Sequence, residues 1–173
     1  LLAFIAFGLV ASATYMLNDL LDLASDRRHP RKCRRPFAAG NLGIVPGCIG
    51  MALLLLGGLL LAASLSLWFL LALLSYLALT LSYSLYFKTY VLIDVLLLAL
   101  LYTVRIIAGA IVINVDISSW LLAFSMFMFL SLAVVKRYAE LDDANRAGKP
   151  KAAGRGYSAE DLPLLLSLGT ASG

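Results

Sequence analysis

Residues 18–40 read NDLLDLASDRRHPRKCRRPFAAG and follow an apolar run that is long enough to enter a membrane. On a helix, Asp19, Asp22 and Asp26 stand at positions i, i+3 and i+7, so their carboxylates point the same way. Unpaired, they would repel one another. A hard divalent cation removes this conflict, and Mg²⁺ in such sites is usually shared with substrate phosphates. These three residues, with Asn18 beside them, are therefore the predicted catalytic group, and the three carboxylates are the predicted Mg²⁺ ligands.

The basic residues after the aspartates suit a phosphate group, because guanidinium forks match its oxygens. Arg28, Lys32 and Arg35 are the predicted phosphate ligands of this stretch. Charges that flank a span also serve as solvated anchors that set topology, and this alternative stays open for the basic run. It explains the aspartates less well, because uncompensated carboxylates beside an apolar span are costly.

The composition indicates a membrane protein. Hydrophobic residues make up 62% of the chain and charged residues 14%, against roughly 45–50% and about 25% in soluble domains. The apolar residues form blocks long enough to cross about 30 Å of hydrocarbon. The predicted spans are 1–17, 44–63, 67–85, 93–113 and 118–135, with the start of another from 162. We expect an all-α polytopic transmembrane bundle, a single membrane domain over 1–173 that is truncated at both ends.

The basic residues predict the orientation. Of the five loops between the spans, the first, third and fifth hold every Lys and Arg except Arg105. This asymmetry puts those three loops on the cytoplasmic side. The formal charge of +4 then concerns phosphates and anionic lipid headgroups rather than nucleic acid. We expect an integral protein of the plasma (inner) membrane whose active site faces the cytoplasm.

Arg105 lies inside a predicted span, where an ionisable residue is a candidate for function and is expected to face the bundle interior. Asp94 precedes it by eleven residues, about three helical turns, so the two share a helix face. A structural ion pair or a side chain that snorkels to the membrane surface is the alternative. Arg105 is kept as a predicted phosphate ligand.

A second polar cluster begins where the fifth span ends. Lys136, Glu140 and Asp143 fall at i, i+4 and i+7 on one helix face, and Arg137 lies beside them. The third loop adds Lys88. The three basic residues of these loops are further predicted phosphate ligands: Lys88, Lys136 and Arg137. A salt bridge at a helix end is the alternative for the stretch around Lys136.

The pattern from Asn18 to Gly40, Asn-Asp-x-x-Asp-x-x-x-Asp followed by Arg-x-His-Pro-x-Lys-x-x-Arg-Pro-x-Ala-x-Gly, resembles the first signature of the UbiA superfamily of intramembrane prenyltransferases. The resemblance implies a nine-helix bundle in which this motif binds Mg²⁺ and the diphosphate of an isoprenoid donor. Members normally carry a second Asp-x-x-x-Asp motif in the other half. Here that position reads Lys136-Arg137-Tyr138-Ala139-Glu140-Leu141.

With Lys88 and Val104–Ala110, this departure resembles the decaprenyl-phosphate phosphoribosyltransferase branch. The resemblance implies Mg²⁺-dependent transfer of phosphoribose from phosphoribosyl diphosphate (PRPP) to a polyprenyl phosphate. Two alternatives stay open. One is an aromatic prenyltransferase that takes a polyprenyl diphosphate and an aromatic acceptor, which a second acidic pair would favour. The other is a lipid-binding or transport protein without chemistry.

Overall fold

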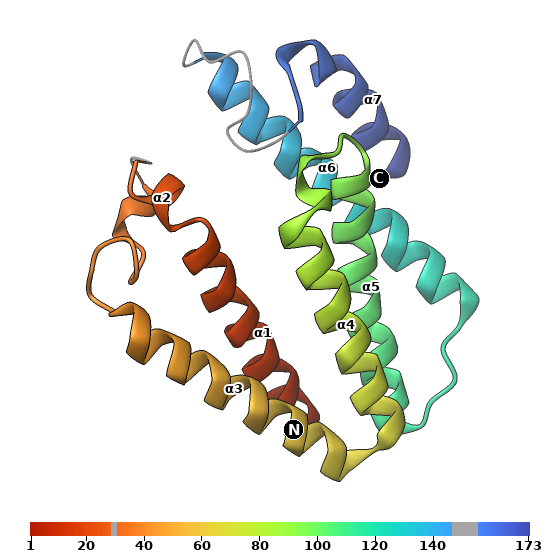
Figure 1. Cartoon of the computed structure of the whole chain (residues 1–173). Coiled ribbons are helices and arrows are strands. Elements are labelled where there is room, and N and C mark those ends of the chain that lie inside the picture. The colour runs from red at the N-terminus through yellow and green to blue at the C-terminus, as the bar shows by residue number, and fades with distance from the viewer. Residues whose placement is uncertain (29–30, 147–155) are drawn as a thin grey trace. The chain divides into compact units, whose positions relative to one another are not determined.

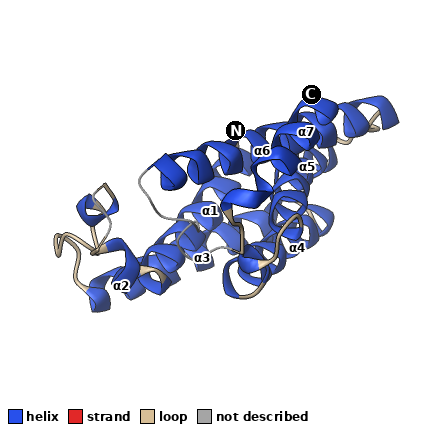
Figure 2. Ribbon diagram, turned by 90° about the horizontal axis from the view of Figure 1, so that it is seen from above, coloured by secondary structure: helices blue, strands red, loops and turns tan. Residues whose placement is uncertain are grey.

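The computed structural model describes residues 1–28, 31–146 and 156–173, and the regular structure in these ranges is helical, without a β-strand (Figures 1 and 2). The α-helices are α1 (Leu2–Leu21), α2 (Leu23–Asp26), α3 (Ile44–Leu65), α4 (Leu67–Leu85), α5 (Ile93–Ile113), α6 (Ser119–Arg146) and α7 (Leu162–Ser172). Short 3₁₀ turns lie between them: η1 (Lys32–Arg34), η2 (Phe87–Thr89) and η3 (Ala159–Asp161).

Five of these helices are long and apolar enough to cross a membrane: α1, α3, α4, α5 and α6. They confirm the predicted all-α membrane fold, and the predicted spans match them closely. The larger differences are at two carboxyl ends. The first helix continues past Asp19 to Leu21, and α6 continues from the predicted end at 135 to Arg146. In α6 the charged helix formers Lys136, Arg137 and Glu140 continue the helix, because apolarity limits how far a helix lies in lipid but not how long it is.

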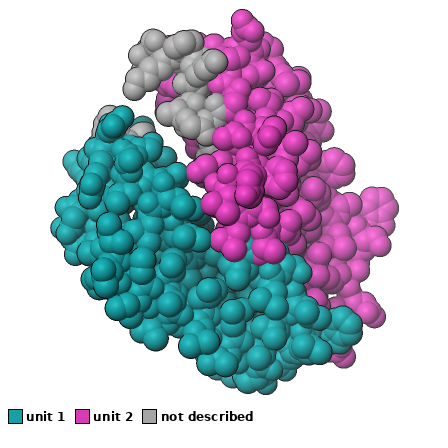
Figure 3. All heavy atoms as spheres, viewed as in Figure 1, with its two compact units in different colours: residues 1–77 teal, residues 78–173 magenta. Residues whose placement is uncertain are grey.

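The chain divides into two compact units, Leu1–Leu77 and Ala78–Gly173, with the boundary inside α4 (Figure 3). In the first unit, α1 and α3 pack side by side. A Cβ atom added to Gly58 of α3 would lie 2.7 Å from Val10 Cγ2 and 3.0 Å from the Ala6 carbonyl oxygen. The helices can approach this closely only because Gly58 has no side chain. That the whole chain forms one membrane domain stays a prediction.

In the second unit, α6 packs against both α5 and α7 (Figure 1). The close approach of α6 and α7 again uses a glycine, since a Cβ atom on Gly169 would lie 3.3 Å from Val134 Cγ1. The Ser131 hydroxyl donates a hydrogen bond of 3.0 Å to the Gly169 carbonyl oxygen across the same contact. The buried core of the unit consists of Val95, Ala133, Val134, Leu141, Tyr157 and Leu165.

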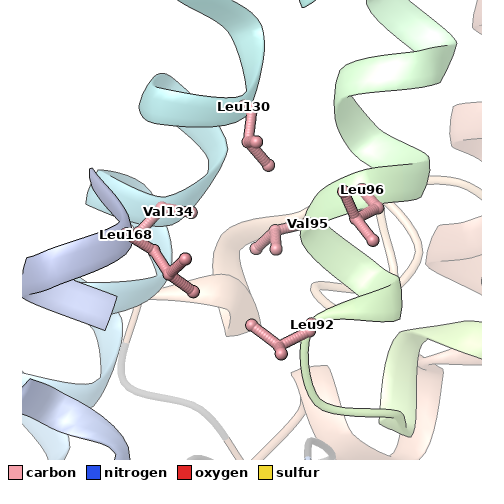
Figure 4. A pocket seen from close by; sticks show the side chains of 6 residues that line it. All are labelled: Leu92, Val95, Leu96, Leu130, Val134 and Leu168. Atoms are coloured by element: carbon pink, nitrogen blue, oxygen red, sulfur yellow. The ribbon is translucent and has the colours of Figure 1, made fainter. Parts of the chain in front are cut away.

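An apolar cavity of about 140 Å³ lies beside this core, between α5, α6 and α7. Figure 4 shows the six side chains that line it, which are Leu92, Val95, Leu96, Leu130, Val134 and Leu168. No polar side chain is among them.

Candidate active site

The aspartate motif lies at the carboxyl end of α1, where the helix is interrupted. The first helix ends at Leu21, Asp22 has φ −92° and ψ 6°, and α2 begins at Leu23. Aspartate favours such helix ends, because its side chain competes for backbone hydrogen bonds. The regular helical spacing assumed for the three aspartates is therefore interrupted at Asp22.

Two of the three carboxylates nevertheless converge on one point. Arg35 Nη1 lies 2.8 Å from Asp19 Oδ1 and 2.8 Å from Asp26 Oδ2. The side chain of Asp26 is only 3% exposed, against 24% for Asp19 and 39% for Arg35. A single cationic nitrogen thus contacts two carboxylate oxygens, one of them on a buried side chain, and compensates part of their charge.

The loop that carries Arg35 is anchored by its neighbours. Phe37 is buried, and a Cβ atom on Gly47 would lie 2.2 Å from the ring atom Cε1 of Phe37. The first turn of α3 therefore has a glycine where the phenylalanine ring lies. This contact fixes the chain two residues after Arg35 and so directs the guanidinium toward the aspartates.

The other predicted residues of the motif differ in their exposure. Asn18 and Asp22 are half-buried, whereas Arg28 and Lys32 are exposed. Their predicted functions stay predictions. Within the described residues, no group of three or more His, Cys, Asp and Glu side chains lies close enough to hold a metal ion. The donor set still suits a hard cation, because two carboxylates already meet at one cationic atom and Mg²⁺ takes one or two carboxylates plus substrate phosphates.

A second charged cluster is buried in the other unit. Asp94 lies in the first turn of α5 and Arg137 lies in α6, and they are 0% and 1% exposed. Arg137 Nη2 lies 2.7 Å from Asp94 Oδ2, and Arg137 Nη1 pairs with Glu140. Both terminal nitrogens of this guanidinium are therefore occupied by carboxylates of the chain itself.

Tyr157 completes the cluster from the segment before α7. Its hydroxyl donates a hydrogen bond to Asp94 Oδ1 and accepts one of 2.9 Å from the Leu92 backbone N–H. The Arg137 guanidinium carbon lies 5.8 Å from the centre of its ring. Burial, and then the hydrogen bond to Asp94, raises the pKa of Tyr157, so the hydroxyl keeps its proton and acts as a donor.

The remaining predicted cations have different surroundings. Lys136, next to the buried Arg137, is exposed, and Lys88 in η2 is half-buried. Arg105 is half-buried, and its guanidinium carbon lies 5.1 Å from the centre of the Tyr102 ring. Asp94 is eleven residues away along α5, a rise of about 16 Å along the helix axis.

The pairing of Asp94 with Arg137 and the role of Tyr157 were not predicted. The signal for the first was present, because a buried aspartate in the first turn of a span needs a cation at the same depth. Arg137, at the end of the next span, meets that requirement. Nothing in the sequence around Tyr157 indicates its partners, because 63 residues separate it from Asp94.

The profile of the UbiA prenyltransferase family matches residues 1–167. The chain is 39% identical to nodulation protein NoeC of Azorhizobium caulinodans over 99% of its own length and 56% of the relative. It is 38% identical to the decaprenyl-phosphate phosphoribosyltransferase of Mycolicibacterium smegmatis over 84% of its own length and 46% of the relative. An uncharacterized protein of Sinorhizobium fredii is 42% identical over 98% of this chain and 33% of that protein.

The chain thus spans about a third to a little over half of the curated relatives that it matches. A solved structure of a UbiA homolog from Archaeoglobus fulgidus, bound to GPP and Mg²⁺, has the same fold. Its TM-score is 0.80 at 20% identity, and the match covers 99% of this chain and 62% of that chain. With a family match over almost its entire length and this fold, the chain belongs to the UbiA prenyltransferase family.

Proposed function

We propose that the protein is a Mg²⁺-dependent membrane transferase that moves phosphoribose from PRPP to a polyprenyl phosphate. The observation that carries this choice within the family is the basic pair at Lys136 and Arg137, where a second acidic motif is expected. Relatives at 36–38% identity bear the name decaprenyl-phosphate phosphoribosyltransferase, which favours the same substrates. PRPP and a lipid phosphate together bring more negative charge than one isoprenoid diphosphate. Cationic side chains bind such negatively charged groups directly.

The metal would be held by Asp19 and Asp26, whose oxygens already meet at one cation, with Asp22 and Asn18 completing or orienting the site. Bound there, Mg²⁺ supplies charge neutralisation for a diphosphate leaving group. Arg35 is then free to bind phosphate oxygens, because its side chain is partly exposed. Arg28 and Lys32 lie on the same basic loop and would bind the same diphosphate.

The reaction requires little proton transfer by the protein. The bond between C1 of the ribose and the diphosphate oxygen breaks, and an oxygen of the lipid phosphate bonds to C1. The lipid phosphate is ionised near neutral pH and needs no general base. The residues of this chain therefore act by binding and orienting the two phosphorylated substrates and by stabilising the charge that collects on the diphosphate.

Lys136 is the best candidate of the second unit for direct contact with PRPP, because it is exposed at the end of α6. Lys88 and Arg105 remain candidates for the lipid phosphate. Arg137 as a phosphate ligand stays a prediction, and its guanidinium has two carboxylate partners in this structure. The lipid tail would lie against the apolar helix faces within the bilayer.

The experiment is a comparison of substrate pairs with purified full-length protein. Labelled PRPP with a polyprenyl phosphate should give a labelled lipid and free diphosphate, and chelation of Mg²⁺ should stop the reaction. Transfer from a polyprenyl diphosphate to an aromatic acid, with PRPP ignored, would instead assign an aromatic prenyltransferase. Turnover of neither pair, with lipid bound, would assign a lipid-binding or transport protein.

The proposed cytoplasmic orientation has its own test. Cysteines introduced at positions 31 and 87, in a background without Cys33 and Cys48, should react with an impermeant reagent only from the cytoplasmic side. A cysteine at Asp116 should react only from the other side, because alternate loops share a side. Labelling of positions 31 and 87 from opposite sides would contradict the orientation.

A further inference from the structure

The buried cluster of the second unit joins three segments that are far apart in the sequence. Asp94 belongs to α5, Arg137 to α6, and Tyr157 to the segment before α7. All three side chains are among the largest that are fully buried. A buried carboxylate and guanidinium are costly to remove from water, and they persist where charged and hydrogen-bonding partners compensate that cost. Here the Asp94 carboxylate has a guanidinium on one oxygen and a hydroxyl on the other.

The backbone around Tyr157 is shaped for this contact. A Cβ atom on Gly156 would lie 2.3 Å from the Thr89 carbonyl oxygen, so only glycine lets the segment approach η2. Leu92, whose N–H donates to the Tyr157 hydroxyl, has φ +66° and ψ −40°. A non-glycine residue in that region is uncommon and persists where surrounding contacts hold it. The tyrosine hydroxyl is one of those contacts.

The cluster also gives Lys136 and Arg137, which are neighbours in the sequence, different surroundings. Consecutive residues on a helix are turned by about 100°, so the burial of Arg137 directs Lys136 to another side of α6. That side is exposed. Arg137 is held inward by Asp94 and Glu140, and this anchors the turn of helix from which Lys136 projects.

We propose that Asp94, Arg137 and Tyr157 form a buried clamp that fixes the carboxyl end of α6 and thereby positions Lys136 for the phosphate of PRPP. The inference rests on the proposed function for its substrate, but the clamp itself does not. Tyr157, Asp94 and Arg137 act as positioning residues, whereas Lys136 contacts the substrate. Tyr157 is the most informative residue to substitute, because phenylalanine keeps its ring and removes only the hydroxyl.

The experiment compares Tyr157→Phe with Tyr90→Phe in the full-length protein in nanodiscs. Tyr90 is an exposed tyrosine two residues before Leu92, the partner of Tyr157, and its ring contact with Phe87 survives in phenylalanine. Misplacement of a binding group can cost about a hundredfold, and we expect Tyr157→Phe to lower kcat/KM for PRPP by about ten- to a hundredfold. The KM for the polyprenyl phosphate should stay near its wild-type value, and Tyr90→Phe should behave as wild type. Equal behaviour of both variants would overturn the proposal.

A double variant tests the route through Lys136. On a Lys136→Ala background, Tyr157→Phe should cause little further loss of kcat/KM for PRPP, because the group that it positions is already gone. Losses that multiply would mean that the clamp does not act through Lys136. If Tyr157→Phe folds poorly, the pair Asp94→Asn with Arg137→Gln gives the second measurement. Arg137→Gln alone should lower thermal stability more than the double change, because it leaves the Asp94 carboxylate buried without its guanidinium partner.

Hydrogen exchange separates failure of the clamp from failure of the proposed function. The Leu92 amide donates to Tyr157, so Tyr157→Phe should speed exchange in the peptide that contains Leu92, whatever the protein catalyses. Unchanged exchange there would overturn the clamp. A wild-type protein that shows this protection but transfers no phosphoribose would overturn the proposed function and, with it, the assignment of PRPP to Lys136.

Discussion

Replacement of Arg35 by glutamine tests whether one arginine compensates part of the charge of the aspartate site. The change removes a cation that lies 2.8 Å from both Asp19 and Asp26. Loss of one partner of a buried ion pair costs about 3–5 kcal/mol, and exposed pairs contribute roughly 0–1 kcal/mol. Asp26 is buried, but Arg35 is 39% exposed and Asp19 is 24% exposed. Solvent therefore screens part of the interaction, and we expect a loss of about 2–3 kcal/mol, between these two limits.

The assay is thermal unfolding of the purified full-length protein in detergent, with Arg34→Gln as the matched control. Arg34 is the preceding residue, is exposed, and makes no ion pair with another described residue. Its replacement should change stability by less than about 0.5 kcal/mol, as surface changes usually do. Adding Asp26→Asn to Arg35→Gln should recover part of the loss, because the buried charge is removed together with its partner. If Arg35→Gln proves as stable as Arg34→Gln, the convergence of both aspartates on Arg35 is refuted.

Three further outcomes are expected. Gly58→Ala should lower the free energy of unfolding by about 1–3 kcal/mol, because the added methyl group meets α1; Gly57→Ala, whose methyl group meets nothing within 4 Å, should leave it unchanged or raise it. Gly156→Ala should be destabilising in the same thermal assay, because its methyl group would meet the Thr89 carbonyl oxygen, and a neutral result would contradict that packing. Asp19→Ala should lower turnover by about 10²–10³-fold and weaken the Mg²⁺ dependence while the protein still inserts into membranes; near-normal activity at saturating Mg²⁺ would remove Asp19 from the proposed site.

The membrane spans could be predicted because they depend on a local property, the length of an apolar run. The predicted and observed bounds of the fourth span are both 93–113. Apolarity says nothing about where a helix stops after it leaves the lipid, and α6 continues to Arg146 with an ion pair between Arg146 and Asp142. Helical spacing also does not report interruptions: Asp22 lies between the end of α1 and the start of α2.

The candidate site was predicted in composition but not in pairing. The residue types around Asp19 indicated cation and phosphate chemistry, and the structure adds that Arg35 lies between two of the carboxylates. In the second unit, Asp94 was linked by helical periodicity to Arg105, although its ion pair is with Arg137. Contacts between distant segments depend on how helices pack, which periodicity within one helix does not report. Tyr157 reaches the cluster by the same long-range packing.

Arg35 and Arg137 also differ in how easily a substrate phosphate could displace their carboxylate partners. Arg35 is partly exposed, so a bound diphosphate can draw it away from the aspartates at a small desolvation cost. Arg137 is 1% exposed and has two carboxylate partners, and withdrawing it would leave Asp94 buried and uncompensated, at a cost of about 3–5 kcal/mol. Under the proposed function, Arg35 is therefore the arginine that exchanges carboxylates for substrate phosphate during turnover. Arg137 stays in place, and the exposed Lys136 beside it is left to meet the second substrate.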